Sequence, residues 1–355
     1  MGALNLLRPI WNSGTCIDLG KRQIVLDPRS SKPNADLTTV SHAHFDHIQG
    51  FLNPSRKLAT LETMKIFQAR TRKKVYNSES VQYGRKLSFD DLEISFHDAG
   101  HVLGSAQVRI NDGEETLVFT SDINVGKSLT LPEAEVLDSD ILIIESTYGS
   151  PMYSFPPRED IYIEMAEWSA QRVCKQKIPV FCVYPLGKGQ EVIKVINEYT
   201  NIPAVVHPTI KDISDIYVES GIGLDYKSFS DEEGKEILLG GECACVVPSL
   251  RSLPSLKSKE ISPAAVTGWG TRFKTRDLDK VFTLSSHADF SQLMDYISAS
   301  SPSEVYTVYG YTKQFAKHIR RKLGIEAMPI TDSINGLSYS FRKSTKQTRL
   351  SSFIE

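Results

Sequence analysis

The chain has 355 residues, of which 40% are hydrophobic and 24% charged, an ordinary composition for a globular protein with enough length for two cores. The net charge of −2 excludes a general attraction to nucleic acid, so such binding must use local basic patches at residues 70–74, 320–322 and 342–349, each of which also fits a solvated surface. No apolar run approaches the roughly 20 residues of a membrane helix, and the five cysteines form no Cys-x-x-Cys pair, which predicts a cytoplasmic protein in a reducing compartment.

The first half of the sequence consists of short strand patterns. Gly20 lies in the turn of a predicted hairpin, and Ile141 begins a fully apolar run that is typical of a buried central strand. The strands are predicted at residues 16–19, 23–26, 36–40, 92–97, 107–110, 116–120 and 141–144.

After Tyr148 the pattern changes to strands that alternate with helices, which indicates a second unit with a parallel sheet. This unit is expected to end near the polar, loop-like residues 254–263, and Gly324 is expected to cap a final helix. Helices are predicted at residues 159–173, 191–199, 290–298 and 312–323, and strands at residues 179–184, 281–284 and 305–308.

Four residues of metal-binding types lie within six positions, directly after the predicted strand that ends at residue 40. His42 and His44 are separated by one residue and face the same way on an extended chain, so both can reach one ion. Asp46 and His47 then turn toward a second ion. Imidazole and carboxylate ligands suit zinc best, with manganese or iron as alternatives. A solvated polar loop is the competing interpretation.

Two further candidates also follow strands: His101 and Asp122. A carboxylate at such a position can bridge two ions about 3.5–4 Å apart. Alone, each would more often be a hydrogen-bonded polar residue, but beside the first cluster we interpret both as ligands.

The order His-x-His-x-Asp-His, Gly-His and Ser-Asp resembles the metallo-β-lactamase fold, which hosts several chemistries. The segments at residues 143–149, 179–191 and 284–290 resemble those of the β-CASP nucleases. The resemblance implies an αββα sandwich, formed by residues 1–150 and 265–340, with an inserted β-CASP α/β domain at residues 151–264 and a flexible tail at 341–355.

The same resemblance implies roles for individual residues. His42, His44 and His101 would hold the first ion, Asp122 would bridge, and Asp46 and His47 would hold the second. The implied catalytic residues are Asp46, Glu145 and His287. His287 would protonate the leaving oxygen, and Glu145 would orient the imidazole of His287.

Two positions are predicted to contact substrate. Lys188 follows Gly187 at the predicted start of a helix. It is either a contact for a substrate phosphate or an ordinary exposed lysine in a turn. Tyr309 stands where RNA-processing members carry a histidine of the second metal site. Because a phenol stays protonated up to a pKa of about 10, we expect the second ion to bind weakly or the site to work with one.

The substrate is predicted to be DNA, since residues 267–270 and 310–312 resemble a compact branch of DNA-ligase-associated exonucleases. Residues 347–354 resemble a box that binds the sliding clamp PCNA, although a frayed terminus with three apolar residues is the alternative. The partner-binding residues would be Gln347, Leu350, Phe353 and Ile354. The alternatives are an RNA exonuclease or endonuclease of the mRNA 3′-end-processing type, and a scaffold subunit that has lost catalysis.

Overall fold

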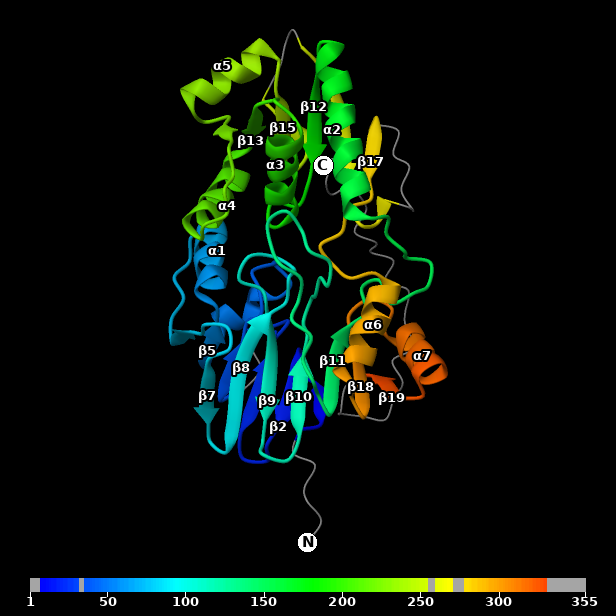
Figure 1. Cartoon of the computed structure of the whole chain (residues 1–355). Coiled ribbons are helices and arrows are strands. Elements are labelled where there is room, and N and C mark those ends of the chain that lie inside the picture. Colours follow the sequence, from blue (N-terminus) through cyan, green and yellow to red (C-terminus); the bar gives the residue numbers. More distant parts are fainter. Residues whose placement is uncertain (1–6, 32–34, 255–258, 271–277, 331–355) are drawn as a thin grey trace. The chain divides into compact units, whose positions relative to one another are not determined.

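The computed structural model describes residues 7–31, 35–254, 259–270 and 278–330 (Figure 1). These residues form two compact units. Unit 1 comprises the described residues up to Lys127, Leu131–Ser154 and those from His287 onward, and unit 2 comprises Ser128–Thr130 and Phe155–Ser286. Unit 2 therefore interrupts unit 1 in sequence. The domain limits at residues 150 and 265 remain a prediction.

Unit 1 is built on two mixed sheets (Figure 1). The first has the order β1-β2-β3-β4-β5-β6, and the second has the order β19-β18-β11-β10-β9-β8-β7. The strands of the first are β1 (Pro9–Trp11), β2 (Thr15–Asp18), β3 (Gln23–Leu26), β4 (Leu37–Thr39), β5 (Arg56–Ala59) and β6 (Ser78–Ser80). The strands of the second are β7 (Lys86–Phe89), β8 (Leu92–Asp98), β9 (Ala106–Asn111), β10 (Thr116–Phe119), β11 (Ile141–Glu145), β18 (Glu304–Val308) and β19 (Glu326–Pro329).

Strand alternation divides the apolar residues of the second sheet between two cores. Phe119 and Ile143 join a buried cluster with Ile24 of the first sheet, so this core lies between the sheets. Leu142 and Ile144 point the other way and pack against helices α6 (Phe290–Ser300) and α7 (Thr312–Leu323). A strand that is buried on both faces must be apolar throughout, which is why residues 141–144 carry no polar side chain.

The first sheet has a crossover helix. Helix α1 (Leu61–Thr71) connects β5 to β6, which pair in parallel. Leu58 of β5 faces the core between the two sheets. The helix of the parallel crossover therefore covers the opposite, outer face of the first sheet. Its Phe67 packs on Phe51 of the 3-10 helix η1 (Ile48–Leu52). The α/β class and the αββα sandwich are thus confirmed.

Unit 2 is an α/β unit with a fully parallel sheet in the order β14-β13-β15-β12-β16-β17. Apolar side chains cover both faces: Phe181 lies in one cluster, and Val180 and Cys182 lie in the other. The strands are β12 (Lys177–Cys182), β13 (Ala204–Val206), β14 (Lys227–Ser228), β15 (Ala244–Val247), β16 (Glu260–Val266) and β17 (Lys280–Phe282). The helices are α2 (Arg158–Cys174), α3 (Lys188–Tyr199), α4 (Pro208–Glu219) and α5 (Glu232–Gly240), with the 3-10 helix η2 (Leu250–Ser252).

The sequence prediction erred in the C-terminal part of unit 2. Residues 254–263 were expected to be a loop, but Glu260 begins β16, which pairs in parallel with β12 and β17. Pairing on both sides outweighs the polar composition and Pro263. Helix α1 of unit 1 and helices α4 and α5 of unit 2 were also not predicted, although Pro208 at the start of α4 and the cap supplied by His207 are helix-start signals.

All five cysteines are free, and Cys174 is the exposed one. In the described part of the chain, no helix has the length and apolar character needed to cross a membrane.

Candidate metal and catalytic centre

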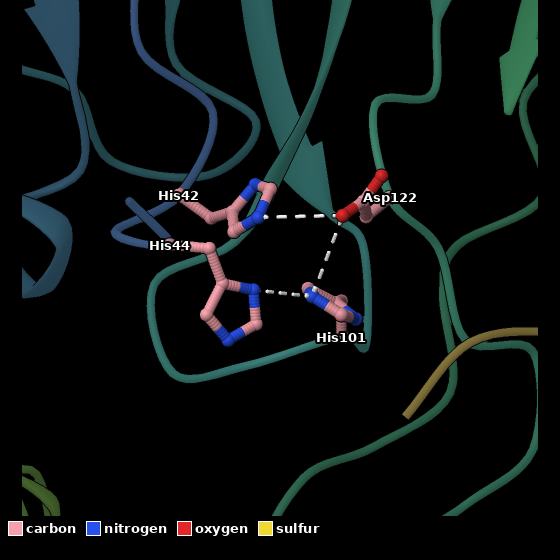
Figure 2. Close-up of side chains that lie close together, drawn as sticks. All are labelled: His42, His44, His101 and Asp122. Carbon is pink, nitrogen blue, oxygen red and sulfur yellow. Dashed lines mark hydrogen bonds and ion pairs between the residues drawn. The ribbon is translucent and has the colours of Figure 1, made fainter. Parts of the chain in front are cut away.

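Ends of separate strands supply the candidate site residues of unit 1. His42 and His44 follow β4, His101 follows β8, and Asp122 follows β10 (Figure 2). Strand ends at one edge of a sandwich bring side chains from distant parts of the sequence together, which is how residues 80 positions apart come to share a site.

The four side chains converge on a common point. Asp122 Oδ2 lies 3.5 Å from His42 Nε2 and 3.8 Å from His101 Nε2, and His101 Nε2 lies 3.0 Å from His44 Nδ1 (Figure 2). One donor atom from each of the four lies within 4.8 Å of the others. Three imidazoles and a carboxylate are a donor set that zinc accepts.

His42 provides the clearest test of whether an ion fits. Its side chain is fully buried, and its Nδ1 hydrogen-bonds to Ser41 Oγ at 2.9 Å. Its Nε2 is buried and has no hydrogen-bond partner within the described ranges. A buried nitrogen without a hydrogen-bond partner carries an unfavourable free energy of desolvation. Coordination of a metal ion by His42 Nε2 would remove this cost, so the cluster fits an ion.

The electrostatics favour the metal-binding forms of the imidazoles. Burial, together with the neighbouring His47, lowers the pKa of His42 well below its ordinary value. Burial also lowers the pKa of His44 to about 3. Both rings are therefore neutral at pH 7, and neutral imidazole is the form that binds metal. Burial raises the pKa of Asp122 to about 6, against the opposing charges of His47 and His287.

The predicted ligands of the second ion are arranged differently. His47 Nε2 lies 3.5 Å from Asp46 Oδ2 and 3.6 Å from Asp122 Oδ2. The Asp46 side chain is 64% exposed, whereas that of His47 is 1% exposed. Tyr309 lies beside this half, with its ring 5.3 Å from that of His47. Burial and the nearby Asp27 raise the pKa of Tyr309 well above its ordinary value, so its phenol is a poor ligand.

Asp27 was missed by the sequence analysis. It directly follows β3, is fully buried, and accepts hydrogen bonds from Ser41 N at 2.7 Å and Ser121 Oγ at 2.7 Å. It also lies 2.8 Å from His47 Nδ1 and so fixes that imidazole. Burial opposes its charge, but His47 and these hydrogen bonds lower its pKa. The rule that found Asp122, a carboxylate just beyond a strand, also fits Asp27.

The structure also brings Glu145 and His287 together. Glu145 ends β11 and is fully buried, and both its oxygens lie 3.0 Å from His287 Nδ1. Glu145 Oε1 also accepts a hydrogen bond from the backbone N–H of Ile123 at 2.7 Å. One donor atom each of Asp122, Glu145 and His287 lies within 4.8 Å of the others. The pair therefore borders the metal cluster within unit 1.

One basic patch has a packing role at this site. Arg70, near the end of α1, lies over the ring of Phe45 at 3.9 Å from the ring centroid and donates to the carbonyl of Ala43. Phe45 itself is 60% exposed. Arg70 therefore supports the backbone between His42 and Asp46 rather than forming only a solvated surface.

Lys188 belongs to unit 2 and is not an exposed turn residue. It is 7% exposed, begins α3 after Gly187, and its Nζ lies 3.3 Å from Ser286 Oγ. Burial lowers its pKa to about 8, against the attraction of Glu191. Glu191 in turn pairs with Arg158 and accepts a hydrogen bond from Tyr162.

The four clamp-box residues, Gln347, Leu350, Phe353 and Ile354, lie outside the described residues.

Comparison with known proteins gives one family model and several relatives that match this chain. A model described as the Zn-dependent metallo-hydrolase RNA specificity domain matches residues 274–329. A "Probable DNA ligase" from Opitutus terrae is 28% identical over 317 residues, which cover 87% of this chain and 30% of that protein. An "RNase J-like protein" from Methanocaldococcus jannaschii is 29% identical over 192 residues, which cover 48% of this chain and 46% of that protein.

The chain thus matches less than half the length of these two relatives. Among solved structures, a protein of unknown function from Enterococcus faecalis V583 has a TM-score of 0.63 at 12% identity, covering 84% of this chain and 93% of that one. This last likeness concerns the fold alone.

Proposed function

Since this chain belongs to the metallo-β-lactamase/β-CASP nuclease family, we propose that it is a metal-dependent nuclease that hydrolyses phosphodiester bonds. The observation that carries the proposal is the adjacency of two elements within unit 1. One is the donor set of His42, His44, His101 and Asp122, and the other is the buried carboxylate–imidazole pair of Glu145 and His287. Hydrolysis of a phosphodiester needs both charge stabilisation and a proton donor.

Zinc is the proposed metal, with manganese as the alternative, because three imidazoles and a carboxylate suit these ions. When bound, the ion supplies Lewis-acid stabilisation of the charge on the reacting phosphate and lowers the pKa of water. The neutral His42 and His44 would hold this ion, and hydrogen bonds between Ser41 and His42 Nδ1 and between Asp27 and His47 Nδ1 fix the orientation of the two rings.

His287 is the proposed proton donor to the leaving oxygen. The buried Glu145 lies at Nδ1 and stabilises the imidazolium form, which leaves Nε2 to donate. Because the N–H of Ile123 and the imidazole both hold Glu145 in place, the ring keeps one orientation through proton transfer. Glu145 therefore positions and charges His287.

We propose DNA as the first substrate and exonucleolytic degradation as the mode. The relative whose match covers 87% of this chain is named a probable DNA ligase, which supports a role beside DNA joining in repair or replication. RNA is the second candidate, because the matching family model is named for RNA specificity and another relative is named RNase J-like.

Digestion of matched DNA and RNA oligonucleotides, labelled at either end, tests this proposal. The zinc-loaded chain is expected to shorten single-stranded DNA progressively from one end and to stop when EDTA is added. Preferential cleavage of RNA would establish the second candidate. If the metal-loaded chain cuts neither polymer above the level of a His42→Ala control, the nuclease proposal fails.

Two contacts complete the proposal. Lys188, buried at the start of α3 with a hydroxyl neighbour, is proposed to bind a substrate phosphate.

The tail residues Gln347, Leu350, Phe353 and Ile354 are proposed to bind a sliding clamp. Deletion of residues 347–355 should abolish co-migration with the clamp and leave cleavage of short oligonucleotides unchanged; clamp binding by the truncated chain would refute the assignment.

A further inference from the structure

Arg29 already pairs with Asp46, the residue expected to hold a second ion. Arg29 Nη1 lies 2.8 Å from Asp46 Oδ2 and donates to the Asp46 carbonyl oxygen at 2.7 Å. Two bonds from one guanidinium to one residue fix both the side chain and the loop that carries it. The Asp46 carboxylate is thus neutralised by a protein cation.

Tyr309 holds Arg29 from another side. The guanidinium carbon lies 4.4 Å from the centroid of the Tyr309 ring, and the same ring contacts His47. Tyr309 adopts φ +57°, a backbone region that is strained for an aromatic residue. Hydrogen bonds from the Ser146 hydroxyl to the carbonyls of Val308 and Tyr309 fasten this turn. The ring is therefore held in place at a cost in backbone strain.

In the part of the chain that the structure describes, Asp46 does not join a group of three or more converging donor atoms, although its Oδ2 lies 3.5 Å from His47 Nε2. The described residues contain three groups of His, Asp and Glu whose donor atoms lie within 4.8 Å of one another, and Asp46 belongs to none of them. His47 is committed at Nδ1 to Asp27. The Tyr309 hydroxyl is buried and finds no hydrogen-bond partner among the described residues, so a phenol stands where a further ligand would be needed.

We propose that the Arg29 guanidinium replaces a second metal ion: the chain binds one divalent ion tightly, and Arg29 supplies the other positive charge toward a substrate phosphate oxygen. A guanidinium keeps its charge at every physiological pH and its planar donors match a phosphate. Its positive charge repels a second divalent ion. It also pairs with the Asp46 carboxylate, which such an ion would need as a ligand. The phosphate part rests on the proposed nuclease function, whereas the metal count does not.

Zinc content per chain tests the proposal independently of activity. The protein is loaded with excess zinc, desalted and measured by plasma mass spectrometry. Wild type is expected to retain about one zinc. The double variant Arg29→Ala/Tyr309→His frees Asp46 and adds an imidazole at a left-handed position that histidine tolerates better than most residues, so about two are expected. Arg22→Ala is the matched control, because it removes an exposed arginine of the same unit, and should retain one.

Two results would overturn the proposal: two equally tight zinc ions in wild type, or a single zinc in a folded double variant. Should the double variant fail to fold by circular dichroism, Arg29→Gln alone takes its place, because an amide keeps much of the shape without the charge. Its zinc titration should then show a second binding step, and the absence of that step refutes the claim that Arg29 excludes a second ion. If an Arg29 variant loses nuclease activity but still retains one zinc, the claim that Arg29 excludes a second ion is refuted.

Discussion

The two halves of the candidate centre differ in what neutralises their carboxylates. Around His42, the donor residues His42, His101 and Asp122 are buried, and His42 Nε2 has no hydrogen-bond partner in the described part of the chain. Around Asp46, the carboxylate is largely exposed and paired with Arg29. The residue types of the two halves are alike, yet their surroundings favour a metal ion in one and a protein cation in the other. Ligand chemistry alone therefore does not decide occupancy.

Loss of His42 should have the largest effect. His42→Ala removes a fully buried donor, so zinc retention should fall below one per chain and nuclease activity by at least about 10³-fold, as expected when transition-state charge is no longer stabilised. Zinc content and oligonucleotide cleavage measure both. His97→Ala is the control, since His97 bonds Ser95 and Glu135 elsewhere in unit 1. Full activity in His42→Ala would show that His42 is not needed as a metal ligand.

Glu145→Gln should have the next largest effect while leaving zinc in place. The amide still accepts a bond from His287 but no longer stabilises its imidazolium, so kcat should fall by about 10²-fold. A nitrophenyl phosphodiester, whose leaving group needs no proton, should show a much smaller loss. An equal loss on both substrates would mean that Glu145 acts on something other than proton transfer.

Asp46→Ala should be milder than His42→Ala if the two halves differ as described. It releases Arg29 without touching the first donor set, so activity should fall roughly tenfold, as for other residues that act through a neighbour. The retained zinc should stay at one per chain. A loss as great as that of His42→Ala, accompanied by loss of zinc, would show that Asp46 is a primary ligand.

Lys188 offers the smallest effect and contrasts with Arg29, since burial lowers the pKa of Lys188 to about 8. Its ammonium loses its proton as pH rises through 8, so KM for oligonucleotides should rise about threefold between pH 7 and 9. Above pH 8 the folded state holds Lys188 neutral, whereas the unfolded chain keeps it charged up to a pKa of about 10.4. The free energy of unfolding should therefore increase with pH over this range. Lys188→Arg should flatten both profiles; a KM rise that persists in this variant would disprove the phosphate contact.

Periodicity and residue order predicted much of the architecture. The apolar residues 141–144 indicated a central strand, and that strand is β11. Strand–helix alternation after Tyr148 indicated the parallel unit, whose sheet is parallel throughout. Gly324 was expected to end the last helix and does so at φ +70°. These features depend on local pattern and on burial, which leave their mark within a few residues.

The sequence by itself also predicted which side chains would lie together, because His42, His44, His101 and Asp122 each follow a strand, and side chains at one edge converge. Only the tertiary structure decided how those groups are charged and partnered. Asp27 behind His47 and Arg29 between Asp46 and Tyr309 act across separations of 17 to 280 residues. Such contacts leave no periodic trace in sequence, since a side chain's electrostatic surroundings are set by whatever the fold packs against it.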